Sequence, residues 1–183
     1  MTDLIHARLL QTARRIAAEE RTPVSMAFEP VGLILEEQPA RWDYFCTPLN
    51  SITFGSTGGD GVHFGLLSDA DLPQPPVVMT VPMAETTNVV LAANLHDFLR
   101  LGYFRGFFSL EQLVYQWEEC VRDHLREDDE AEERERTLLS ALRQEFGLSP
   151  MPDLSEYIRR VDGTYRDRLA IPDFETWRNE HGV

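Results

Sequence analysis

Residues 51–67, SITFGSTGGDGVHFGLL, constrain the fold most, because two apolar stretches flank a turn of small residues at 57–61. Apolar residues alternate with polar or small ones on both sides of the turn, which is typical of β-strands. Glycines and an Asp-Gly pair supply the positive backbone dihedrals that a tight hairpin requires. The segment therefore predicts two antiparallel strands, 51–56 and 61–67, joined by a short loop.

Three catalytic or phosphate-binding loops have similar compositions, and none fits. A P-loop needs a lysine to reach the phosphates, and all 17 basic residues of this chain are arginines. A dinucleotide fingerprint is followed by a helix, whereas residues 62–66 alternate as a strand. A nucleophile elbow requires GxSxG in a strand-to-helix turn, and residues 55–58 read GSTG. We therefore interpret the glycines of this turn as residues that allow the backbone of a hairpin, and not as part of a catalytic or phosphate-binding loop.

The alternation also assigns the hairpin residues to faces. The apolar faces carry Ile52, Phe54, Val62, Phe64 and Leu66, and the opposite face carries Thr53, Gly55, His63 and Gly65. That second face has few large side chains. Either a helix packs closely onto it or it forms a shallow groove, and strand glycines favour close packing.

The rest of the first 108 residues predicts a helix followed by an antiparallel meander of about five to six strands. Apolar spacing predicts the helix over residues 3–19, capped by Thr2 or Asp3. Further strands are expected at 25–28, 32–35, 76–82 and 88–92. A short helix should follow over residues 95–101, with a start at Asn94 and a stop at Gly102.

Residues 109–183 predict helices only. Ser109 and Gln112 match a capping box for a helix whose apolar face includes Trp117, which we expect in the core. Helical spacing resumes at residues 138–146, and a final helix from Leu154 should end before Pro172. The prediction is an α+β fold with an N-terminal helix, divided into an α+β domain (1–108) and an acidic helical extension (109–183) packed on it.

The charge of the chain limits its partners. A formal net charge of −14 repels nucleic acid and attracts basic proteins. Residues 118–135 hold ten acids and three arginines, a net charge of −7, which predicts a solvated helix face. Direct binding to DNA or RNA is therefore not expected, and a basic protein partner is.

The sequence shows no pattern for a cofactor, a metal or a catalytic centre. The two cysteines have no zinc-site spacing, and the five histidines form no HxH or HExxH motif. Asp60 and His63 straddle a turn, so their spacing does not converge on one atom. No apolar run reaches membrane-spanning length, and the first 20 residues lack a signal core. We expect a cytoplasmic protein that is not an enzyme and binds no membrane.

The order of these elements resembles a known superfamily over roughly residues 40–108. The segment TPLNSITFGSTGGDGVHFGLL, the proline-flanked strand VVMTVP and the helix NLHDFLRLGYF are similar to the SUKH superfamily. That group includes the yeast cell-wall-synthesis regulator and many bacterial toxin-immunity proteins. The resemblance implies an α+β protein-binding module with no conserved catalytic constellation, and it leaves the helical extension unexplained.

The leading hypothesis is an immunity protein that neutralises a nuclease- or deaminase-like toxin domain by direct binding. The alternative is a regulatory or scaffolding protein of a cellular complex. A third class, an enzyme, would use Asp60, His63 and the sheet face. Arg41, Trp42 and Tyr44 belong to a rim or to the core, and packing is favoured for Trp42. The expected partner-contact residues are Asp60, His63, Glu118, Glu119, Asp123, Glu127, Asp128 and Asp129.

Overall fold

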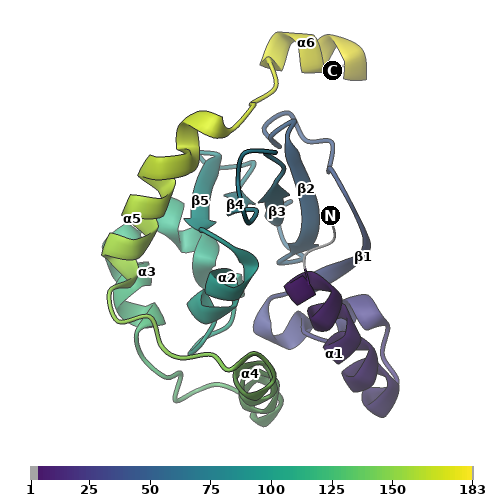
Figure 1. Ribbon diagram of the computed structural model, residues 1–183, viewed down its shortest axis with the longest axis vertical. Helices are drawn as coiled ribbons and strands as arrows, with labels where there is room; N and C mark the ends of the chain where they lie inside the picture. Colours follow the sequence, from purple (N-terminus) through teal and green to yellow (C-terminus); the bar gives the residue numbers. More distant parts are fainter. Residues whose placement is uncertain (1–3, 183) are drawn as a thin grey trace.

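A computed structural model describes residues 4–182, and it has the α+β fold that the sequence predicts. Helix α1 (Leu4–Glu20) comes first, followed by a five-stranded antiparallel sheet and then by the remaining helices. Figure 1 shows the sheet in the middle, with α5 beside β5 at one edge and β1 at the other edge. The expected caps of α1, Thr2 and Asp3, lie outside the described residues.

The sheet is the predicted meander, with strands in the order β1-β2-β3-β4-β5. Its strands are β1 (Ile34–Ala40), β2 (Ser51–Ser56), β3 (His63–Leu67), β4 (Val77–Thr80) and β5 (Asn88–Ala92). The expected strand at 25–28 is wrong. That region holds two 3₁₀ turns, η1 (Val24–Met26) and η2 (Glu29–Val31), with one isolated bridge between Phe28 and Leu33. Pro30 lies in the first turn of η2, a position that proline tolerates in helical turns.

The β2–β3 hairpin confirms the reading of the glycine-rich turn. Gly58, Asp60 and Gly61 have φ values of 83°, 48° and 73°. Thr57 N donates to Val62 O at 3.1 Å, which closes the loop. A register shift between Thr53 and Gly55 interrupts simple alternation, as a β-bulge does.

The apolar side of the sheet packs on the helices. Phe98 of α2 (Leu95–Leu101) contacts Phe54 and Phe64, with ring centroids 5.5 and 4.9 Å apart. Ile52 does not join this cluster and is 42% exposed. Helix α2 has its predicted bounds, and its N-cap Asn94 accepts a hydrogen bond from Asp97 N at 2.8 Å.

The first helix of the extension differs from the prediction. Residues from Ser109 form a 3₁₀ segment, η3 (Phe108–Val114), and α3 (Trp117–His124) starts only after a break at Gln116. Ser109 therefore caps no α-helix. Trp117 is only partly buried against the core, and its Nε1 donates to Ser155 Oγ at 3.0 Å.

Three more helices complete the chain, namely α4 (Glu133–Phe146), α5 (Leu154–Tyr165) and α6 (Phe174–His181). Helix α5 caps the edge of the sheet, because Asp162 accepts a hydrogen bond from Val90 N and Tyr157 accepts one from Ala93 N. Helix α6 was not predicted. It follows a short 3₁₀ turn, η4 (Arg166–Arg168), and has no fully buried residue.

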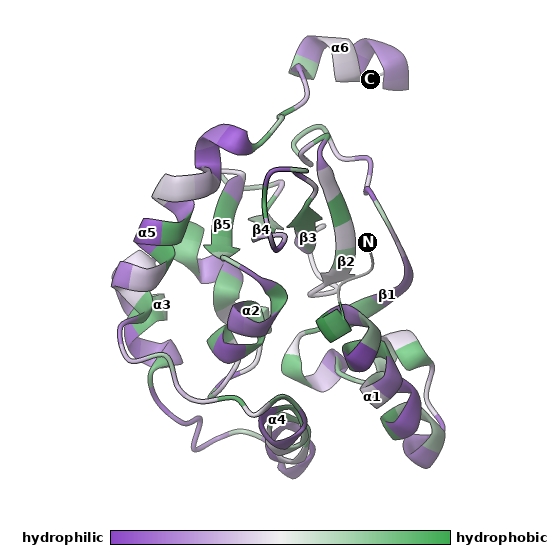
Figure 2. Ribbon diagram, viewed as in Figure 1, coloured by the Kyte–Doolittle hydropathy of each residue, from purple (hydrophilic) through white to green (hydrophobic). Residues whose placement is uncertain are grey.

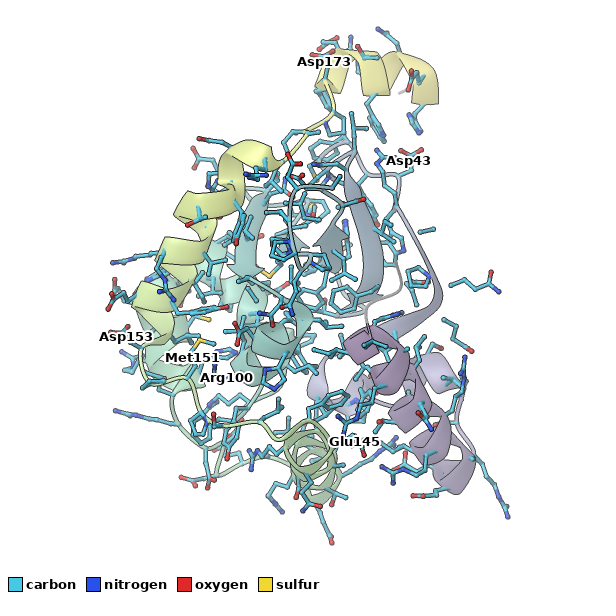
Figure 3. The ribbon with its side chains drawn as sticks, in the orientation of Figure 1. Asp43, Arg100, Glu145, Met151, Asp153 and Asp173 are labelled. Carbon is cyan, nitrogen blue, oxygen red and sulfur yellow. The ribbon has the colours of Figure 1, made fainter. Side chains whose placement is uncertain are left out.

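One hydrophobic core joins the sheet to the helices of both halves. The buried cluster runs from Leu9 of α1 through Phe64 and Phe98 to Leu142 of α4 and Ile158 of α5. Hydrophobic residues concentrate on the strands in Figure 2, whereas α6 is largely hydrophilic. Arg100 of α2 also reaches the carbonyls of Ser149 and Pro150 at 3.1 and 3.3 Å, beside Met151 (Figure 3). Residues 109–165 thus pack on the first 108.

Candidate protein-binding surface

His63, an expected contact residue, is the first residue of β3 and has only 1% of its surface exposed. Its Nδ1 donates to Gly61 O at 2.7 Å, so in the neutral ring Nε2 accepts from the Thr47 hydroxyl at 3.0 Å. Burial lowers the pKa of His63, and the hydrogen bond to Gly61 opposes this shift. His63 is therefore a satisfied structural histidine, and the expectation that it contacts a partner is corrected.

The polar face around His63 is neither open nor covered by a helix. The cover segment, residues 41–50, crosses it between β1 and β2. The Trp42 and Tyr44 rings lie 5.1 and 5.6 Å from the His63 ring, and Asn88 donates to Cys46 O at 3.0 Å. Neither of the two alternatives for this face, a helix packed on it or a shallow groove, is found, because a loop covers it. Trp42 is half-buried, as a packing residue.

The glycines of the hairpin strands are also closely packed against their neighbours. A Cβ added at Gly55 would lie 3.0 Å from Ile34 O, and one at Gly65 would lie 3.2 Å from the Ser51 Cβ. Neighbouring strands, and not a ligand or a groove, occupy the space that these glycines leave.

Cys120 and His124 form the only cysteine–histidine contact within residues 4–182, with the sulfur 3.6 Å from Nδ1. That nitrogen donates to Cys120 O at 3.2 Å, so in the neutral ring it carries a proton and cannot accept the thiol proton. Burial, and then the charge of Asp123, raise the pKa of the Cys120 thiol to about 12. A nucleophilic cysteine needs a lowered pKa, so this pair is structural.

The same part of the chain offers no metal site. No group of three or more His, Cys, Asp and Glu side chains within residues 4–182 is placed to hold a metal ion. Asp60 does not meet His63, because Asp60 is exposed in the turn while His63 points into the protein. The enzyme hypothesis therefore loses the pair of residues on which it depended.

The acidic run of residues 118–135 is not one helix face. Glu118, Glu119 and Asp123 lie on α3, whereas Glu127, Asp128 and Asp129 lie in the loop between α3 and α4. The α3 acids are partly neutralised by arginines, since Glu118 pairs with Arg159 at 3.1 Å and Arg122 pairs with Glu119 and Asp123. The expectation of a single acidic helix is corrected. Of the loop acids, Glu127 and Asp129 have no arginine partner within residues 4–182, whereas Asp128 pairs with Arg105.

This loop borders a surface hollow that sequence reasoning missed, which we call the acidic groove. It is lined by Glu29, Pro30, Val31, Gly32, Arg105, Phe108, Ser109, Asp128, Glu132, Arg134 and Glu135. Arg105 holds the loop in place by donating to Asp128 Oδ2 at 3.1 Å and to Arg126 O at 3.3 Å. Phe108, exposed over 59% of its surface, lies among these charged groups.

Two further acids, Glu111 and Asp60, lie near the acidic groove without lining it. Phe108 and Glu111 are three residues apart in η3, and a 3₁₀-helix places such residues on the same side. Burial raises the pKa of Glu111, and the nearby negative charge of Asp60 adds to that shift. Asp60, Glu111, Phe108 and Asp128 thus belong to one acidic surface. The sequence held no usable signal for this surface. Phe108 is one of ten phenylalanines, and its exposure is visible only in the structure.

Comparisons with protein-family models, curated proteins and solved structures found no match to this chain. The fold and surface described above therefore carry the functional argument. Among the helices of residues 4–182, none combines the length and the apolar character that crossing a bilayer needs.

Proposed function

We propose that this chain is a non-enzymatic binding protein that neutralises a bacterial toxin domain, nuclease- or deaminase-like, by binding its basic surface. The observation that carries the proposal is the acidic surface from Asp60 to Asp128, built around an exposed aromatic ring. Interfaces are enriched in such aromatic residues, and acidic surfaces steer basic partners into contact.

Charge and chemistry support this proposal independently. With a net charge of −14, the chain repels nucleic acid but attracts a protein that binds nucleic acid through a basic surface. Two side chains of types that often act in catalysis, His63 and Cys120, are buried and hydrogen-bonded within the fold, and burial raises the pKa of the Cys120 thiol. The resemblance of residues 40–108 to the SUKH superfamily favours the same class of function.

The proposal is tested with the product of a toxin gene next to the gene for this chain. Purified protein should bind that toxin and abolish its activity, and the association rate should fall as the salt concentration rises. Absence of binding to every neighbouring gene product would contradict the proposal.

Paired charge variants locate the contact. Asp60→Asn with Asp129→Asn removes two exposed acids at or beside the acidic surface, and we expect association to slow several-fold. The matched control, Asp167→Asn with Glu180→Gln, changes the net charge equally at η4 and α6, the other end of the molecule (Figure 1), and should act weakly. Equal effects of the two pairs would show that only the total charge matters.

A further inference from the structure

The backbone of Phe108 is closely packed, although more than half of the residue's surface is exposed. A Cβ on Gly32 would lie 2.3 Å from Phe108 N, so η2 and η3 touch through backbone at this point. The preceding residue, Phe107, is fully buried, and its N–H donates to Val31 O at 2.7 Å. The fold therefore fixes the backbone position of Phe108 but buries less than half of the residue's surface.

Other aromatic rings in this chain are covered by arginines. Within residues 4–182, guanidinium groups lie over the rings of Tyr103, Trp117, Phe146 and Tyr157, at 4.4 to 5.7 Å from the ring centroids. No such group lies over Phe108 in that part of the chain. One of the two arginines that line the acidic groove, Arg105, is already bound to Asp128 and to Arg126 O.

The groove has carboxylates that could pair with a cation from outside. Its second arginine, Arg134, is bound to Glu20 at 2.6 Å. Glu29 and Glu132 are exposed and pair with no basic side chain among residues 4–182, although the Glu132 carboxylate also accepts a hydrogen bond from Glu135 N as the N-cap of α4. An excess of negative charge next to an uncovered ring favours a planar cation, which stacks on the ring and donates to carboxylates at the same time.

We infer that the acidic groove binds an arginine side chain of the partner, with its guanidinium over the Phe108 ring and its N–H groups directed to Glu29 or Glu132. This inference rests on the proposed function, because it specifies the contact through which a basic toxin domain is held. A second copy of the chain is a poor occupant, since each copy carries a net charge of −14.

The test uses two blocked peptides, acetyl-tetra-arginine amide and acetyl-tetra-lysine amide, titrated into the full chain at low salt and followed by backbone amide NMR. Shifts should saturate and should concentrate at Gly32, Ser109 and Glu132. Stacking on an exposed ring predicts that tetra-arginine binds about two- to fivefold more tightly than tetra-lysine.

Phe108→Leu keeps an apolar side chain next to Gly32 but removes the ring, so it should abolish the preference for tetra-arginine. Tyr115→Leu is the matched control, because Tyr115 is similarly exposed in the same region of sequence but does not line the groove, and the preference should persist. Equal binding of the two peptides to the unaltered chain, or an unchanged preference in Phe108→Leu, would overturn the inference.

The peptide result and the toxin result separate the two proposals. If tetra-arginine is preferred through Phe108 but no neighbouring toxin is inhibited, the groove assignment stands and the immunity function fails. If the toxin is inhibited equally by the unaltered chain and by Phe108→Leu, the immunity function stands and the groove assignment is wrong.

Discussion

At the scale of single residues, the hairpin turn shows how far local sequence determines structure. The composition of residues 57–61 predicts positive φ angles, and Gly58, Asp60 and Gly61 have them. What the composition does not reveal is which glycine also lacks space for a side chain. A Cβ at Gly61 would lie 2.8 Å from the Tyr44 ring, whereas one at Gly59 would meet nothing within 4 Å.

Gly61→Ala should therefore lower the free energy of unfolding by about 1–3 kcal/mol, because alanine would be strained at φ 73° and would press on Tyr44. Gly59→Ala, two residues away, should change it by no more than about 0.5 kcal/mol. Chemical denaturation of the two variants measures the difference. Equal losses would mean that flexibility of the turn, and not the fit of Gly61, is what matters.

At the scale of elements, α6 is the part whose position depends on contacts distant in sequence. Its Phe174 and Trp177 rings pack edge-on against Phe45 of the cover segment, at 5.6 and 5.9 Å. His181 pairs with Asp43 at 2.8 Å, and Asp43 and Asp173 both lie next to α6 in Figure 3. An eight-residue helix with such a small contact is only weakly held, since short isolated helices are marginal in water.

Docking of α6 should depend on pH. Hydrogen bonds to Trp177 O and then to Asp43 raise the pKa of His181 above its ordinary value. Only the bond to Asp43 joins α6 to the cover segment, so protonation of His181 favours docking while Asp43 is ionised. The contact should weaken as pH rises through the raised pKa of His181, and also as pH falls through the pKa of Asp43, which the hydrogen bond with His181 lowers. Histidine titration by NMR should give a midpoint above about 6.5 for His181.

Asp43→Asn should lower that midpoint, because it removes the charged partner, while the bond to Trp177 O remains. Glu127→Gln removes one charge from the remote loop and serves as the control, with little expected change. An unshifted midpoint in Asp43→Asn would show that α6 does not dock on the cover segment in solution.

At the scale of the whole molecule, residues 1–108 and 109–183 share one core. Leu110, Leu142 and Ile158 are buried in the same cluster as Phe98 and Phe107, and α5 supplies hydrogen bonds to the edge of β5. Removing these helices would expose the apolar residues of the sheet. The acidic, helical character of residues 109–183 suggested a separate part of the chain, but one shared core joins it to the first 108 residues.

Two truncations test this unity. A chain of residues 1–108 should fail to unfold cooperatively, because it loses the core residues of η3, α3, α4 and α5. A chain of residues 1–170 loses only α6 and its linker, which have no fully buried residue, and should unfold cooperatively as the full chain does. Calorimetry of both distinguishes the cases. A sharp transition for residues 1–108 would establish an independent domain.

Elements with strong local signals could be predicted from the amino-acid sequence. Alternation and turn residues predicted β2, β3 and β5, and the Asn94 cap with Gly102 predicted α2. Local signals failed where a competing contact decided the backbone, as at η3, where the close fit between Gly32 and Phe108 accompanies a 3₁₀ segment in place of the expected helix.

Which polar residues are exposed, and which of them lie together, depends on tertiary packing. His63 and Asp60 are three residues apart, yet one is covered by residues 41–50 and the other is exposed beside Glu111. The acidic groove combines η2, η3 and the loop before α4, which are separated by up to about a hundred residues of sequence. The charge and type of each residue can be read from the sequence. Which side chains are buried, and which lie close together, depends on packing between distant segments, which no local pattern specifies.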